Sequence, residues 1–218
     1  MTQKPNKQDE YSRLYKMIVT GQIMPNERIV EMDYAKLFEC NRANIRHALA
    51  RLEQDGLVVI EPRKGARVRK FTPQQAVEAY EVRGALETML VAYAARYATP
   101  EDAENFTGIL AGMATALENS DLMRVGAYGR KLREEFWRIS RHETAARMLR
   151  QINSQLIRVS YRPVMMPGRA PAMMAELGEV AEAVGRNEEA RAQAAMTKYH
   201  DSARKALIQA LEMQDSVY

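Results

Sequence analysis

The sequence predicts a mainly α-helical chain in two parts: three helices followed by a two-stranded hairpin, and then a bundle of six helices. Apolar residues recur at three- and four-residue spacing through most of the 218 residues, which is the period of an amphipathic helix. Charge is also divided unevenly, because residues 1–70 contain 14 Lys and Arg against 9 Asp and Glu, while residues 71–218 contain 18 against 19. We therefore expect a basic domain over 1–70 and a near-neutral domain over 71–218.

Composition excludes several other classes of protein. Hydrophobic residues make up 46% of the chain and charged residues 28%, which is typical of a globular protein and not of a disordered one. The longest apolar stretch, Met89–Ala95, is far shorter than the roughly 20 residues of a membrane span, and no leader segment opens the sequence. Cys40 is the single cysteine, so an intrachain disulfide and a cysteine zinc cluster are ruled out. We expect a cytoplasmic protein without a membrane partner.

The first domain is expected to contain three short helices. Apolar spacing predicts a helix over 11–18 that Gly21 stops, and Asp33 is expected to cap a second helix over 33–38. A third helix is predicted over 41–55. Its inward positions are Ile45, Ala48, Leu49 and Leu52.

The third helix and the hairpin after it follow the order of a winged helix-turn-helix. Strands are expected over 57–60 and 66–69, with a basic turn between them. Arg42 and Arg46 lie one helical turn apart, so both guanidinium groups project from one side of the helix, where they can enter the major groove of DNA. The alternative is a solvated, charged helix face beside a charged turn. We expect DNA contacts from Arg42, Asn44, Arg46, His47, Arg63, Lys64 and Gly65.

The second domain is expected to be helical throughout. Thr72 can cap its first helix with Pro73 at the first helical position, and Val82 belongs to the apolar residues expected to make that helix central. A break rich in Pro and Gly covers 163–171. The six predicted helices cover about 73–98, 100–119, 120–139, 143–162, 172–184 and 188–213.

Two segments resemble a known family. ECNRANIRHALARLEQDGL, over Glu39–Leu57, and the following VVIEPRKGARV resemble the winged-helix domain of GntR-family transcriptional regulators. Its usual recognition helix, Ser-Arg-Thr-Pro-Val-Arg-Glu-Ala-Leu, matches residues 41–49 in both arginines and the apolar frame. AYEVRGALETMLVAYAARYATPED resembles the start of the helical effector domain (FCD type) of the FadR subfamily, in its shorter VanR-like form. The resemblance covers 8–212 and implies a homodimeric regulator that binds a two-fold DNA operator.

The sequence departs from this subfamily at the metal site that many of its members carry, which consists of one Asp and three His. Alignment without gaps places Arg133 at the Asp, and places Trp137, Leu177 and Tyr199 at the histidines. Arg, Trp and Leu cannot bind a metal ion, and one Tyr is not sufficient. We therefore predict no metal and no other cofactor.

Two smaller departures concern single positions. A second-helix Arg that often contacts DNA in the family is replaced by Met32, which predicts a different operator preference. A shift of one residue would place His200 at the last histidine position, but one histidine cannot form a metal site. We expect both His200 and His142 to be partly exposed helix residues.

The effectors of the subfamily are usually small carboxylates, and a carboxylate still requires a cation when the metal is missing. Arg133 could replace the metal, with Gly129 leaving space one turn earlier. The alternative is that Arg133 pairs with a neighbouring Glu or points to water. The expected effector contacts are Arg83, Arg133, Trp137, Arg158 and Tyr199.

We expect a regulator, commonly a repressor released by its ligand, and there are two alternative functions. An enzyme is disfavoured because the sequence contains no nucleophile with a base, no metal cluster and no phosphate-binding Gly loop, and its three histidines are scattered. A constitutive DNA-binding protein with a ligand-free helical dimerisation domain is the alternative that the sequence does not exclude.

Overall fold

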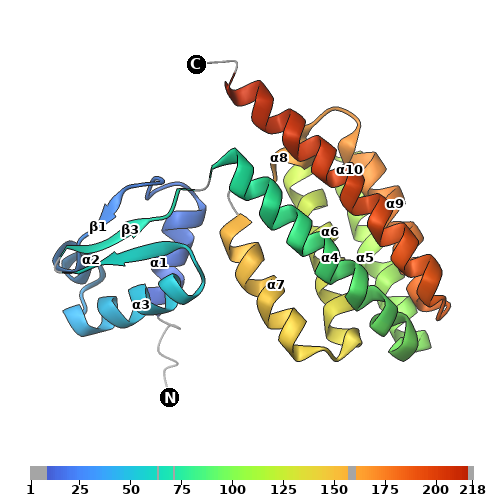
Figure 1. The fold of residues 1–218 in the computed structure, drawn as a ribbon, viewed down its shortest axis with the longest axis horizontal. Coiled ribbons are helices and arrows are strands. Elements are labelled where there is room, and N and C mark those ends of the chain that lie inside the picture. The colour runs from blue at the N-terminus through green and yellow to red at the C-terminus, as the bar shows by residue number, and fades with distance from the viewer. Residues whose placement is uncertain (1–8, 63, 71, 157–160, 216–218) are drawn as a thin grey trace. The chain divides into compact units, whose positions relative to one another are not determined.

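A computed structural model describes residues 9–62, 64–70, 72–156 and 161–215 of the chain (Figure 1). The chain divides into two compact units. Within the described residues, the first unit contains three helices and three short strands, and the second contains seven helices. Residues 151–156, at the end of one of these helices, group with the first unit.

The first unit is built on α1 (Glu10–Val19), α2 (Glu31–Phe38) and α3 (Arg42–Gln54). Side chains cap two of these helices: Asp9 accepts a hydrogen bond from the Ser12 amide, and Asn41 accepts one from the Asn44 amide. The inward positions predicted for the third helix are confirmed, because Ile45, Ala48, Leu49 and Leu52 are all buried.

The start of the second helix differs from the prediction. Asp33 does not cap α2, which begins two residues earlier at Glu31. The backbone carbonyl of Val30 accepts a hydrogen bond from the Asp33 amide, so Asp33 already lies inside the first turn. Its negative charge still favours that position, because the N-terminus of a helix carries partial positive charge.

The hairpin is formed by β2 (Val58–Glu61) and β3 (Gly65–Val68), which pair antiparallel as predicted. A third strand that the sequence did not indicate, β1 (Arg28–Ile29), pairs with the other edge of β3. The order in the sheet is therefore β1-β3-β2. Ile29 is fully buried, so this two-residue strand also contributes to the core of the first unit.

The second unit begins with two helices that carry capping boxes. Thr72 and Gln75 exchange hydrogen bonds at the start of the first, and Thr99 and Asp102 do so at the start of the second. The helices of this unit are α4 (Pro73–Tyr97), α5 (Pro100–Glu118), α6 (Leu122–Ser140), α7 (Glu143–Leu156), α8 (Arg162–Met165), α9 (Arg169–Gly185) and α10 (Glu189–Asp215).

The break over 163–171 is more structured than predicted. It contains the one-turn helix α8, with a proline in its first turn, and α9 begins at Arg169 instead of 172. The described part of α7 ends at Leu156, and residues 157–160 lie outside the described part of the chain. The described residues of the second unit therefore form seven helices where six were expected.

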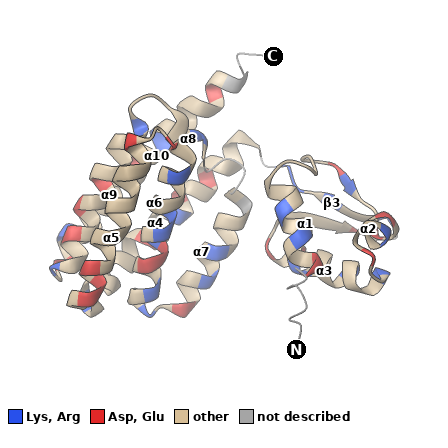
Figure 2. Cartoon of the chain, turned by 180° about the vertical axis from the view of Figure 1, so that it is seen from behind, with Lys and Arg blue, Asp and Glu red and all other residues tan. Residues whose placement is uncertain are grey.

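The interior of the second unit lies around α4, which packs against α6, α9 and α10 (Figure 1). Both signs of charge are distributed along these helices (Figure 2). Val82 was expected to face inward, but it is 52% exposed. Arg83 and Glu87 are buried in its place. Among the described helices, none has an apolar stretch long enough to cross a bilayer.

Candidate nucleic-acid interface and effector site

The outer face of α3 presents the polar side chains that the sequence predicted for DNA contact. Arg42 and Arg46 project into solvent with 58% and 65% of their side chains exposed. Asn44 and His47 are exposed beside them, while the apolar face of the helix packs into the core. The packing fixes the helix, and the donors on its free face remain accessible to a large partner.

Glu31, at the start of α2, pairs with both arginines. Its carboxylate accepts two hydrogen bonds from Arg46, at 3.0 and 2.9 Å, and one from Arg42 at 3.2 Å. These hydrogen bonds from the arginines lower the pKa of Glu31 despite its partial burial. Met32 follows directly and is exposed, so this position presents a thioether where the family often has an Arg.

Asn44 has two roles at the start of α3. Its backbone amide is capped by Asn41, and its side-chain amide donates a hydrogen bond to Glu10 at 3.2 Å. Glu10 lies in the first turn of α1, so Asn44 links these two helices across the predicted DNA-binding face.

The tip of the hairpin carries the remaining predicted DNA contacts. Lys64 is exposed, and its backbone carbonyl accepts a hydrogen bond from the Arg28 side chain. Gly65 has φ +89°, and a Cβ atom there would lie 2.4 Å from the Ile29 carbonyl oxygen. Gly65 is therefore required for β1 to approach β3, in addition to any contact with DNA. Arg63 lies outside the described residues.

Four polar side chains are buried together inside the second unit. Arg83 and Glu87 come from α4, Arg133 from α6 and His200 from α10. An Arg133 Nη atom donates to Glu87 Oε1 at 2.9 Å, and His200 Nε2 lies 2.8 Å from Glu87 Oε2. We call these four residues the buried polar quartet.

The charges of the quartet do not balance. Burial acts to raise the pKa of Glu87, but Arg133, His200 and Arg83 together lower it to about 2, so Glu87 is ionised. Burial lowers the pKa of His200 below 6.5, although Glu87 acts to raise it. The imidazole is therefore neutral near pH 7. Two guanidinium groups therefore face one carboxylate, and the quartet carries a net positive charge.

Arg83 is the less well compensated cation. Its guanidinium lies 3.9 Å from the centre of the Tyr80 ring, a cation–π contact, and it forms no ion pair with the described residues. The Nε atoms of both Arg83 and Arg133 are buried without a hydrogen-bond partner there. Buried donors of this kind are costly unless an acceptor reaches them.

The other predicted effector contacts are less closely grouped. Tyr199 is buried with its ring 5.0 Å from that of His200, so it borders the quartet. Trp137 instead packs in an apolar cluster with Leu90 and the inner face of α7. Arg158 lies outside the described residues.

Comparison with known proteins places both units. Residues 7–68 match the family model described as bacterial regulatory proteins, gntR family, and residues 78–202 match the FCD domain. The second match covers more than half of the chain. The chain belongs to the GntR family and carries an FCD domain.

Curated relatives of this GntR-family chain are named as HTH-type transcriptional regulators. YdhC of Bacillus subtilis is 40% identical over 81 residues, which cover 37% of this chain and 36% of YdhC. A regulator from the ttuE-ttuC′ intergenic region of Agrobacterium vitis is 32% identical over 115 residues, which cover 51% of this chain and 67% of the relative. The chain therefore matches about a third of the length of one relative and two thirds of the other.

Solved structures of GntR-type proteins share the fold. McbR/YncC of Escherichia coli superposes with a TM-score of 0.75 at 18% identity, covering 91% of this chain and 95% of that one. Lar, which controls expression of the agr system of Listeria monocytogenes, superposes with a TM-score of 0.66 at 18% identity, covering 96% and 99%. The relatives are transcriptional regulators and not enzymes.

The absence of the family's metal ion stays a prediction for this GntR-family chain. Arg133, which the resemblance aligns with the Asp ligand, is the cationic partner of Glu87. Leu177 and Tyr199, which it aligns with histidine ligands, are both buried. Among the described residues no group of three His, Cys, Asp or Glu side chains could hold a metal ion.

The prediction for His200 was wrong in its exposure, whereas His142 is partly exposed as predicted but lies just before α7 and not in a helix. His200 is only 8% exposed, because Gly84 leaves room for its ring: a Cβ atom at Gly84 would lie 3.2 Å from the ring carbon Cγ. His142 is partly exposed, and its Nδ1 accepts a hydrogen bond from the Ala145 amide at the start of α7.

Sequence reasoning missed the two carboxylates that organise these sites. Glu31 gave no signal, because an acidic residue in the first turn of a helix is common. Glu87 could have been found: it is four residues after Arg83 and three before Leu90, so it lies on the buried face of α4. A carboxylate at that spacing indicates a buried ion pair.

Proposed function

We propose that this chain is a DNA-binding transcriptional repressor that binds a two-fold operator as a homodimer and responds to a small anionic effector. Residues 1–70 would bind DNA, and residues 71–218 would bind the effector and form the dimer. It would work in the cytoplasm without a metal ion. The observation that carries the DNA part of this proposal is the exposed Arg42 and Arg46 pair on α3.

The α3 face has the chemistry of a base-reading surface. Arg is suited to the O6 and N7 acceptors of guanine, and Asn44 can bond to the edge of a base. Both arginines lie near the start of the helix, where recognition helices of this type contact base edges. Lys64 at the hairpin tip adds a cation for the phosphate backbone. A homodimer would present two such faces to the two halves of an operator.

The buried polar quartet is the proposed effector site. An anion bound near Arg83 and Arg133 would balance the net positive charge and accept hydrogen bonds from their unpartnered Nε atoms. Tyr199 borders the quartet and could donate its hydroxyl. Such an effector changes operator affinity only by as much as its own affinity differs between the DNA-bound and free forms of the dimer.

The DNA part is tested with a duplex selected from a random pool by the purified full chain. Arg42→Ala and Arg46→Ala should each weaken binding to that duplex by about tenfold or more, with a smaller effect on random DNA. Lys64→Ala should weaken binding to the selected and the random duplex alike. It should also reduce the slope of log affinity against log salt concentration by about one. Arg130→Ala, an exposed position on α6, is the control. Equal losses on both duplexes for the arginine variants would contradict base reading.

The effector part is tested by titrating malonate, succinate and acetate into the full chain, alone and bound to the selected duplex. Arg83→Met is the informative variant, because it leaves the ion pair between Arg133 and Glu87 intact. We expect one of these carboxylates to bind and to release the duplex, and Arg83→Met to weaken its binding by about tenfold. If none of them binds or changes operator affinity, the chain is better described as a constitutive DNA-binding protein.

A further inference from the structure

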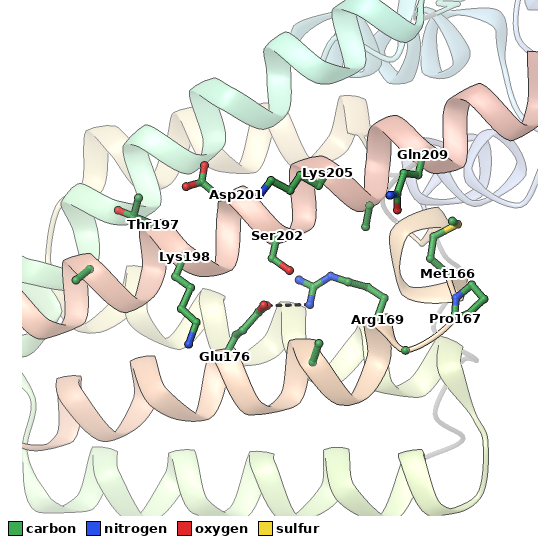
Figure 3. A pocket seen from close by; sticks show the side chains of 14 residues that line it. Met166, Pro167, Arg169, Glu176, Thr197, Lys198, Asp201, Ser202, Lys205 and Gln209 are labelled. Atoms are coloured by element: carbon green, nitrogen blue, oxygen red, sulfur yellow. Dashed lines mark hydrogen bonds and ion pairs between the residues drawn. The ribbon is translucent and has the colours of Figure 1, made fainter.

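A pocket of about 820 Å³ lies between the α8–α9 turn and α10 (Figure 3). Its volume is within the range of about 300–1,000 Å³ that small-molecule sites occupy. It is lined by side chains of α9 and α10 that take no part in the buried polar quartet. Those that matter here are Arg169, Glu176, Lys198, Asp201, Ser202 and Lys205.

Arg169 is the unusual member of this lining. Its side chain is only 6% exposed, and one Nη atom donates to Glu176 at 2.8 Å. The other, Nη2, is buried without a hydrogen-bond partner among the described residues. The guanidinium also lies 5.5 Å from the centre of the Tyr199 ring, so its position is fixed from two sides. A buried donor left in this state is costly until an acceptor occupies the space before it.

The pocket lining contains two further donors, Ser202 and Lys205. Figure 3 shows the Arg169 guanidinium lying between Glu176 and Ser202, with Lys205 on the same helix as Ser202. Neither the Ser202 hydroxyl nor the Lys205 ammonium makes a hydrogen bond or ion pair with the described residues. Gly168, the N-cap residue of α9, provides no side-chain cap, so the partial positive charge of that helix end also faces this region.

We propose that this pocket is a second ligand site, which binds the oxyanion of a small molecule, a carboxylate or a phosphate, on Nη2 of Arg169. Ser202 and Lys205 are further donors in the lining of the pocket. The lining contains no member of the buried polar quartet, and Tyr199 lies against both Arg169 and His200. A guanidinium nitrogen only donates hydrogen bonds, and its positive charge favours a negatively charged acceptor.

The two acidic residues of the lining limit what can bind. Glu176 is already neutralised by Arg169, and Lys198 is paired with Glu179 at 3.0 Å. Asp201 is the remaining carboxylate, and it lies one helical turn before Lys205. It opposes an anion and should weaken the site, so removing its charge should tighten binding.

The experiment is a calorimetric titration of the full chain with inorganic phosphate and, separately, with acetate. Lys205→Ala and Ser202→Ala should each weaken binding several-fold, and Asp201→Asn should tighten it. Arg169→Lys should weaken it by about tenfold, because a lysine can keep the pair with Glu176 but has no second fork nitrogen. Lys131→Ala, an exposed lysine on α6, is the matched control and should have no effect.

The two probes distinguish the ligand classes: tighter binding of phosphate indicates a phosphate compound, and tighter binding of acetate indicates a carboxylate. Saturable binding that follows the pattern of these variants supports the site. No saturable binding of either anion at millimolar concentration would overturn it. Binding that is lost in Arg83→Met but unchanged in Lys205→Ala would also overturn it, because the anion would then occupy the buried polar quartet.

Discussion

Glu31 binds Arg46 through two parallel hydrogen bonds, so a carboxylate of α2 holds a guanidinium that the proposed function assigns to DNA. Arg42 shares the same carboxylate. In the absence of DNA, this arrangement orients the two arginines and partly neutralises them. DNA must therefore compete with Glu31 for the two arginines. This competition reduces the attraction of the arginines to the phosphates of random DNA.

Glu31→Gln should raise affinity for DNA of any sequence, because it removes a negative charge from the face that meets the duplex. It should also lower the ratio of selected to random binding, since the arginines lose their fixed orientation. Fluorescence anisotropy with both duplexes measures the two effects, with Glu39→Gln at the end of α2 as the control. Weaker binding to random DNA would contradict this role of Glu31.

Gly65→Ala should destabilise the first unit by about 1–3 kcal/mol, because a side chain at φ +89° is strained and its Cβ would overlap the Ile29 carbonyl. Urea unfolding of the full chain followed by circular dichroism measures the loss. Gly178→Ala is the matched control: this glycine lies inside α9, and a Cβ there would meet no atom within 4 Å. It should leave stability equal or raise it by about 0.5–1 kcal/mol.

Glu87→Gln should destabilise the second unit by about 3–5 kcal/mol at neutral pH, because it leaves two buried guanidinium groups without a carboxylate. The effect should depend on pH with a definite sign. The pKa of Glu87 falls from 4.5 to about 2 on folding, so its stabilisation is complete above 4.5 and is lost as the pH falls toward 2. The difference in the free energy of unfolding between the two proteins should therefore shrink over that range. A difference that stays constant from pH 5 to 2 would show that Glu87 is not the ionised partner.

Zinc or nickel ions should not change the melting temperature of the chain, and a chelator should not lower it. The resemblance predicts that Arg133 and Leu177 replace metal ligands of the family, and the cation opposite Glu87 is a guanidinium. Differential scanning fluorimetry with each ion and with EDTA tests this. A saturable stabilisation by either ion would contradict it.

The sequence was sufficient to predict the longer helices of both domains, because apolar spacing and, for α4 and α5, a Thr-Pro start are local features. The one-turn helix α8 was missed, because four residues are too few to show a helical period. The exposed face of α3 was predictable for the same reason: once the apolar stripe of the helix is assigned to the core, Arg42 and Arg46 are left on the remaining surface. Strand β1 was not predictable, since two residues carry no period and its pairing depends on β3, far along the chain.

The buried polar quartet was only partly predictable. Arg133 was identified, and one of the two interpretations offered for it, a pair with a neighbouring Glu, is what the structure contains. The inward face of α4 was assigned by hydrophobicity, which placed Val82 inside and overlooked Glu87. Burial of a charge depends on partners from other helices, here α6 and α10, and one helix's own pattern does not contain that information.

The close approach of Gly84 to His200 has a consequence for related sequences. A Cβ atom at position 84 would lie 3.2 Å from the Cγ atom of His200, so the imidazole beside Glu87 would have to shift by a few tenths of an ångström. We therefore expect relatives that have a histidine at position 200 to have a glycine at position 84.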